Sequence, residues 1–225
     1  MMEHIRFFIE IWPELAKGLV VSLQLSAGAL ILGLVIGLPM ALLRTYGKGL
    51  VKALAVGYIE LIRGTPMIVQ LFLIYFGLPD LGILLDRIPA AIIALGINSS
   101  AYQAEYFRGA ILSIDEGQRM AAEALGMTKY QAIIYVILPQ ALRVVIPAWS
   151  NELIYMFKYT SVAFLIAVPE LMARGKMIIS KTFKPLETYF WVGVIYVIVL
   201  SILAKIVDKI EGKLAIPGFQ MSRED

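Results

Sequence analysis

The chain has 225 residues, of which 60% are hydrophobic and only 16% are charged. Soluble domains carry about 25% charged residues, so this composition predicts a chain that is partly solvated by lipid. The formal net charge of +3 is too small for a nucleic-acid-binding surface. Cysteine is absent, which excludes disulfides and thiolate chemistry. We interpret the single histidine, His4, as a solvated residue of an N-terminal tail.

Five apolar segments are each long enough to cross a bilayer, because about 20 helical residues at ~1.5 Å rise span ~30 Å of hydrocarbon. The predicted fold class is therefore an all-α integral membrane protein with five transmembrane helices. We expect a single transmembrane domain over residues 1–225, with no second domain. The predicted spans are approximately residues 18–43, 53–76, 89–112, 138–157 and 189–207.

The first span carries Gly33 and Gly37 at helical spacing, which predicts close packing against another helix of the same chain. The second to fourth spans contain ionisable side chains, which should face protein rather than lipid. Glu60 and Arg63 lie three residues apart and are predicted to pair with each other. Glu105 and Arg108 repeat that spacing in the third span.

Lysine and arginine counts favour one orientation in the membrane. With the N-terminus outside and the C-terminus in the cytoplasm, more Lys and Arg fall on the inner side, as the positive-inside rule requires. A basic cluster between Arg174 and Lys184 falls on the outer side and weakens this bias.

A polar elbow, residues 115–139, separates the third and fourth spans. Asp115 and Glu116 favour a helix start, since acidic groups stabilise the positive end of the helix dipole. Gly126 predicts the end of this short helix in a left-handed conformation. Thr128 is a candidate cap for a second helix that leads to Pro139. An amphipathic helix lying on lipid is the alternative interpretation of this segment.

The elbow resembles the cytoplasmic EAA loop of ABC importer permeases in its spacing of Ala121-Ala122, Leu125-Gly126 and Val136-Ile137-Leu138-Pro139. In that family a coupling helix in this loop docks into a separate ATPase subunit. The family usually has a glutamate where this chain has Met120, and Glu123 one turn later is a candidate substitute. The coupling residues that the resemblance implies are Ala121, Ala122, Glu123, Leu125, Gly126 and Met127.

Three further motifs resemble the polar amino acid permeases of that superfamily, which have the type I importer fold. They begin at Glu60-Leu-Ile-Arg-Gly-Thr-Pro66, at Asn98 and at Asn151-Glu152, and together extend over residues 51–168. The resemblance implies a prokaryotic cytoplasmic membrane, two permease chains (identical or homologous), two ATPase chains and an extracytoplasmic solute-binding protein. No Gly-x-x-x-x-Gly-Lys-Ser/Thr loop is present, so ATP-Mg is expected on the partner subunit and no cofactor on this chain.

Glu152 is the most informative candidate in the substrate site, because an acid at the bilayer centre costs ~2.5–3.5 kcal/mol and needs a partner. A cationic ligand is one such partner, which predicts a basic amino acid: arginine, lysine or histidine. Glu152 pairing with Lys158 or Arg143 of another helix or chain is the alternative. Glutamine transport and an ion-gradient-driven carrier also stay open. The candidate substrate-binding residues are Thr65, Gln70, Asn98, Ser99, Tyr102, Asn151 and Glu152.

Overall fold

The computed structural model describes residues 2–214, and every regular element in this range is a helix. The elements are α1 (Met2–Tyr46), α2 (Gly49–Arg63), α3 (Met67–Phe72), η1 (Leu73–Gly77), η2 (Leu78–Leu81), α4 (Arg87–Leu112), α5 (Glu116–Ala124), α6 (Lys129–Gln131), η3 (Ala132–Ile137), α7 (Leu138–Val144), α8 (Ile146–Tyr159), η4 (Thr160–Ile166), α9 (Leu171–Thr182) and α10 (Pro185–Leu214). The predicted all-α class is confirmed. The N-terminal tail predicted around His4 is instead the first turn of α1, because apolar residues such as Phe7 and Ile11 pack against α9 and α10.

The centre of the bundle is the contact between α1 and α4. A Cβ atom at Gly33 would lie 2.3 Å from Gln103 Nε2, and one at Gly37 would lie 2.7 Å from the Ser100 carbonyl oxygen. Only glycine allows this approach, so the predicted close packing within the chain is confirmed at both positions. Because α4 is held this tightly, its polar residues have fixed positions in the middle of the bundle.

Among the described helices, α1 and α10 are each long and apolar enough to cross a membrane alone. Two further pairs of helices are bent at a short break, and counting each pair as one span gives up to four spans. The first pair is α2 with the segment Met67–Leu81, bent by 103° at the Gly64–Pro66 break that the sequence predicts. The second pair bends by 53° between Val144 and Ile146. The segments 53–76 and 138–157 are therefore broken rather than straight spans. Helix α4 covers the predicted third span, 89–112, but is not among these apolar candidates.

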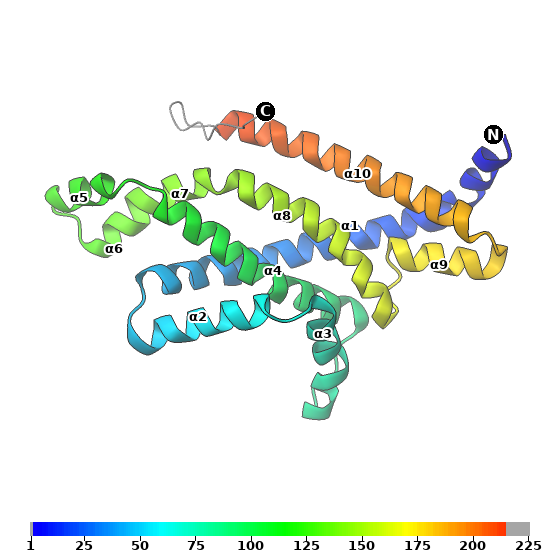
Figure 1. The fold of residues 1–225 in the computed structure, drawn as a ribbon, viewed down its shortest axis with the longest axis horizontal. Helices are drawn as coiled ribbons and strands as arrows, with labels where there is room; N and C mark the ends of the chain where they lie inside the picture. The colour runs from blue at the N-terminus through cyan, green and yellow to red at the C-terminus, as the bar shows by residue number, and fades with distance from the viewer. Residues whose placement is uncertain (1, 215–225) are drawn as a thin grey trace.

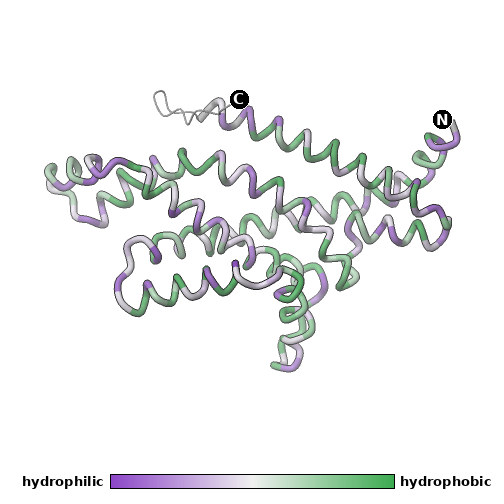
Figure 2. The backbone as a smooth tube through the Cα atoms, viewed as in Figure 1, coloured by the Kyte–Doolittle hydropathy of each residue, from purple (hydrophilic) through white to green (hydrophobic). Residues whose placement is uncertain are grey.

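The bundle is elongated, with different structures at its two ends (Figure 1). Helices α5 and α6 form the elbow at one end, while the N-terminus, α9 and the start of α10 lie together at the other. Hydrophilic residues are frequent at the elbow, whereas α10 is hydrophobic along most of its length (Figure 2). This distribution separates a water-facing end from the apolar body of the molecule.

Candidate functional site

The elbow has the local structure that its sequence predicts. The Asp115 carboxylate accepts a hydrogen bond from the Gly117 backbone N–H at 2.7 Å and caps α5. Gly126 ends this helix with a φ of +85°, in the left-handed region. Thr128 and Gln131 form a reciprocal capping box that starts α6. Two side-chain caps and one left-handed glycine therefore define the local backbone shape of the elbow.

The charges of α5 are paired among themselves. Arg119 donates hydrogen bonds to Glu116 and, at 2.6 Å, to Glu123. The guanidinium of Arg119 lowers the pKa of the Glu116 carboxyl, and the hydrogen bonds to Glu116 and Glu123 raise the pKa of Arg119. Glu123 is the candidate substitute for the family's glutamate, which Met120 replaces in this chain. Its carboxylate is therefore already paired with Arg119 of the same helix.

The outer surface of the elbow exposes large apolar side chains. Leu125 is 82% exposed, Tyr130 78% and Met120 57%, while Ala122 is buried against the rest of the elbow. Large apolar side chains that are this exposed at the hydrophilic end of the bundle are candidates for contact with a protein partner. Of the other predicted coupling residues, Ala121, Glu123 and Gly126 are exposed and Met127 is half-buried.

A buried amide network joins the break after α2 to α4. The Gln70 amide donates hydrogen bonds to the Ile62 carbonyl at 2.7 Å and to the Thr65 hydroxyl at 2.8 Å. Its Oε1 accepts one from Asn98 Nδ2 at 3.1 Å. The network satisfies backbone carbonyls that Pro66 leaves without a helical N–H donor. Thr65, Gln70 and Asn98, predicted separately, are therefore brought together.

Glu152 lies next to this network, on α8, and is 5% exposed. It accepts hydrogen bonds from the Ser99 hydroxyl at 2.6 Å and the Tyr106 hydroxyl at 3.4 Å. Among the described residues no cationic group lies within 4.0 Å of its carboxylate, and Lys158 instead packs over the Tyr155 ring. The buried acid thus has hydroxyl donors and no counter-ion from its own chain.

Sequence reasoning missed three members of this cluster: Gln103, Tyr106 and Trp149. Gln103 donates to Ser99 Oγ at 3.0 Å and accepts a hydrogen bond from the Trp149 indole at 2.8 Å. A signal was present, because Ser99, Gln103 and Tyr106 follow at intervals of four and three residues and so share one face of α4.

The remaining predicted site residues lie at the margin of the cluster. The Tyr102 ring lies under the guanidinium of Arg63, at 5.5 Å from the ring centroid. Asn151 is exposed and points away from the acid that follows it. Neither side chain has a hydrogen bond to the cluster among the described residues. The structure therefore places five of the seven candidates in two hydrogen-bonded groups: Thr65, Gln70 and Asn98 in one, and Ser99 and Glu152 in the other.

The ion pairs below the cluster differ in part from the prediction. Glu60 pairs with Arg44 of α1 at 2.9 Å, so its predicted pairing with Arg63 is wrong. Arg63 lies 3.9 Å from Glu105, whose predicted pair with Arg108 is confirmed at 2.9 Å. The reason is tertiary contact, because α1 brings Arg44 to Glu60 and α4 brings Glu105 to Arg63. One carboxylate, Glu105, therefore connects α1, α2 and α4.

Comparisons with known proteins agree with this architecture. The sequence profile of the family described as "Binding-protein-dependent transport system inner membrane component" matches residues 30–211. The chain is 42% identical to the glutamine transport system permease protein GlnP of Escherichia coli K12, with 92% of this chain and 96% of that protein covered. It is 40% identical to the probable amino-acid permease protein YxeN of Bacillus subtilis, over 94% and 96% of the two chains.

A solved structure of an amino acid transporter has a similar fold. A chain from a crystal structure of an amino acid ABC transporter with histidines superposes with a TM-score of 0.85. The two sequences are 37% identical, and the match covers 92% of this chain and 96% of that chain.

Proposed function

We propose that this chain, which belongs to the binding-protein-dependent transport system inner membrane component family, moves amino acids with basic side chains. It is the permease subunit of an ABC importer for polar amino acids and not the ATPase. The finer assignment, to arginine, lysine or histidine, rests on the residues at the centre of the bundle.

The observation that carries this assignment is the buried carboxylate of Glu152. Its hydrogen bonds to Ser99 and Tyr106 orient the carboxylate but supply no positive charge. A guanidinium or ammonium that reaches it supplies the positive charge that the two neutral hydroxyl donors lack, and forms an ion pair as well as hydrogen bonds. Gln70 and Asn98, whose amides are buried on α3 and α4, are the residues that we expect to hold the polar ends of the same amino acid. Buried charge complementarity is the feature that selects a cation over a neutral side chain.

Glutamine is the second candidate, favoured by the identity with GlnP. The amide network of Gln70 and Asn98 offers both donors and acceptors, which suit a carboxamide side chain. In this case Glu152 binds no ligand, and its role is to hold α4 against α8 through Ser99.

Arginine uptake by one variant separates the candidates. We expect Glu152→Gln to lower arginine uptake by roughly tenfold or more, because removing the charge from a buried ion pair costs above 1.4 kcal/mol. The melting temperature of the purified variant is the control and should match that of the unaltered chain. Unchanged arginine uptake in the variant overturns the basic-substrate proposal. Loss of uptake together with a lowered melting temperature assigns Glu152 to packing between α4 and α8, and also overturns it.

The arrangement in the membrane follows from the same proposal. The single permease domain spans the cytoplasmic membrane of a prokaryote five times, with α4 as the third span, the N-terminus outside and the C-terminus inside. The elbow then faces the cytoplasm, where its exposed Leu125 and Tyr130 dock on one of two ATPase chains that bind ATP-Mg. A second permease chain, identical or homologous, completes the path, and an extracytoplasmic solute-binding protein delivers the amino acid. Closure of the ATPases moves the two elbows together and opens the site to alternate sides.

A further inference from the structure

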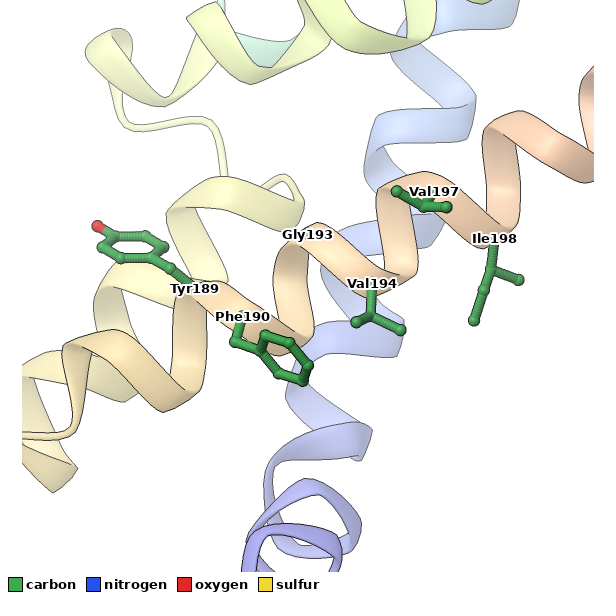
Figure 3. Close-up of a pocket in the computed structure, with 6 residues that line it drawn as sticks. All are labelled: Tyr189, Phe190, Gly193, Val194, Val197 and Ile198. Carbon is green, nitrogen blue, oxygen red and sulfur yellow. The ribbon is translucent and has the colours of Figure 1, made fainter.

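The end of the bundle opposite the elbow has an apolar groove along α10. It has a volume of about 450 Å³ and is lined by Tyr189, Phe190, Gly193, Val194, Val197 and Ile198. Phe190, Val194 and Ile198 project from the same side of the helix (Figure 3). No heavy atom lies within 4 Å of the position that a Cβ would take at Gly193. The missing side chain therefore leaves a notch in an otherwise continuous apolar face.

A second hollow adjoins this groove at Phe190. It has a volume of about 610 Å³ and is lined by His4, Ile5, Leu186, Glu187, Phe190 and Trp191. The two hollows adjoin at Phe190, and we call them together the path; His4 and Glu187 lie at one end of it, and uncharged side chains of α10 line the other. Such a path has the polarity of an amphipathic ligand rather than that of a water-soluble one.

Aromatic side chains place the start of this path at the membrane surface. Trp191 stacks on Phe8 with the ring centroids 4.3 Å apart, and Phe8 also contacts Trp12. Tryptophan gathers at the level of the lipid head groups, where one side of the ring is apolar and the N–H is hydrated. From Tyr189 to Ile198 the groove extends nine residues along α10, or ~13 Å into the hydrocarbon.

The turn between α9 and α10 also has side chains suited to the membrane surface. Phe183 and Leu186 are 85% and 84% exposed, although they flank a turn that water alone would favour as polar. Phe183 also has a φ of +56°, a left-handed conformation that glycine adopts with less strain. Both side chains contact almost no protein, so lipid is the environment that makes their exposure favourable.

Groups of both charge signs lie at the mouth of the path, the end lined by His4 and Glu187. Glu187 lies 3.6 Å from Lys184 Nζ and 3.8 Å from His4 Nδ1, and all three side chains are partly exposed to solvent. Lys184 Nζ also lies 5.0 Å from the centroid of the Phe7 ring, while Arg174 of α9 pairs with Glu14 at 2.7 Å and Lys176 packs over the Phe164 ring. The mouth therefore offers an accessible ammonium group next to an accessible carboxylate.

We infer that this path binds a glycerophospholipid whose head group carries both a phosphate and a primary ammonium. Lys184 pairs with the phosphate, and Glu187 accepts hydrogen bonds from the ammonium. One acyl chain follows the α10 groove past Gly193. A quaternary ammonium has no N–H to donate to Glu187, and a purely anionic head group leaves Glu187 next to a like charge. The inference goes beyond the proposed function, because it is the same for either amino acid substrate.

The test is native mass spectrometry of the purified permease with its associated chains, released from micelles that contain one lipid at a time. Phosphatidylethanolamine, phosphatidylcholine and phosphatidylglycerol with identical acyl chains are the probes. We expect phosphatidylethanolamine to be retained about fivefold more than either of the others, the preference that an ion pair of about 1 kcal/mol gives. Glu187→Gln should remove this preference.

Two glycine variants of α10 test the groove itself. Gly193→Leu fills the notch without a clash and should reduce retention of all three lipids. Gly212→Leu is the matched control, because its Cβ also enters open space on α10 but lies outside the groove. Equal retention of phosphatidylcholine and phosphatidylethanolamine by the unaltered chain overturns the inference, as does preference for phosphatidylglycerol. Retention by Gly193→Leu that equals that of Gly212→Leu also overturns it, and none of these results depends on which amino acid is carried.

Discussion

The elbow and the polar cluster of α4 differ in which side chains they expose and which they bury. The elbow is hydrophilic, pairs the charges of α5 within that helix and leaves Leu125 and Tyr130 exposed (Figure 2). The cluster is in the apolar bundle, and buries Glu152 and Gln103 among hydroxyl, amide and indole partners from three helices. The exposed apolar groups make the elbow suited to a protein partner, whereas the buried polar groups make the cluster suited to a polar ligand.

The difference also concerns how each region is held. The elbow is shaped by caps and one left-handed glycine, which act within a few residues of chain. The cluster depends on long-range packing, above all on the approach of α1 to α4 at Gly33. A change in packing should therefore damage the cluster and spare the elbow, and a change in backbone conformation should do the reverse.

The largest effect is expected from Gly33→Leu. Its Cβ would meet Gln103 Nε2 at 2.3 Å and Ser99 Oγ at 3.0 Å, so both groups must move and their hydrogen bonds must lengthen. Overpacking of this kind costs about 1–3 kcal/mol of stability, and the melting temperature of the purified protein should fall. Gly57→Leu is the matched control, because it gains the same helix propensity with no atom within 4 Å of its Cβ. Equal melting temperatures for the two variants would show that α1 and α4 do not pack as described.

A smaller effect on the melting temperature is expected from Gly126→Val, because its strain falls on the elbow and not on the packed bundle. Space is not limiting at this position, but a β-branched residue at a φ of +85° costs about 1–3 kcal/mol. We expect uptake per ATP hydrolysed to fall while the melting temperature of the bundle is unchanged. Gly126→Asn should behave almost like the unaltered chain, because asparagine tolerates the left-handed region. A normal ratio of uptake to hydrolysis in Gly126→Val would contradict a coupling role for the elbow.

The smallest effect concerns the pH response of α5. Arg119 holds the pKa of Glu116 below its ordinary value of 4.5, so the pair stabilises α5 at neutral pH. This contribution is complete above pH 4.5 and is lost as the pH falls through the lowered pKa. An NMR titration of the Glu116 carboxyl should give a midpoint below 4.5, and Arg119→Gln should move the midpoint up to that value. A midpoint at or above 4.5 in the unaltered protein would mean that the pair is not formed.

Local signals in the sequence were sufficient for the elbow. Asp115, Gly126 and Thr128 each act on the backbone within three residues, so their roles follow from residue type and spacing. The break at Gly64–Pro66 was predictable for the same reason, although its angle of 103° was not. Apolar length alone also predicted α1 and α10 as spans.

Tertiary contacts explain what the sequence did not reveal. Glu60 has Arg63 one turn away, but α1 brings Arg44 to 2.9 Å from it, and no local rule anticipates that choice. Gln103 gives no signal by itself, because its importance comes from Leu30, Ser99 and Trp149, which belong to three different helices. The groove on α10 depends on the side chain that is absent at Gly193, and the adjoining hollow depends on the position of α1; neither can be inferred from hydropathy.

The length of α1 has a mechanical consequence. Its 45 residues form a rod of ~67 Å, more than twice the thickness of the hydrocarbon. Ion pairs tie it to the bundle near both ends, through Glu14 to Arg174 and through Arg44 to Glu60. Pro13 and Pro39 lie near these two ties, and each removes a backbone hydrogen bond, so α1 has two points at which it can bend. Movement at one end of the molecule is therefore carried along the segment between them toward the other end.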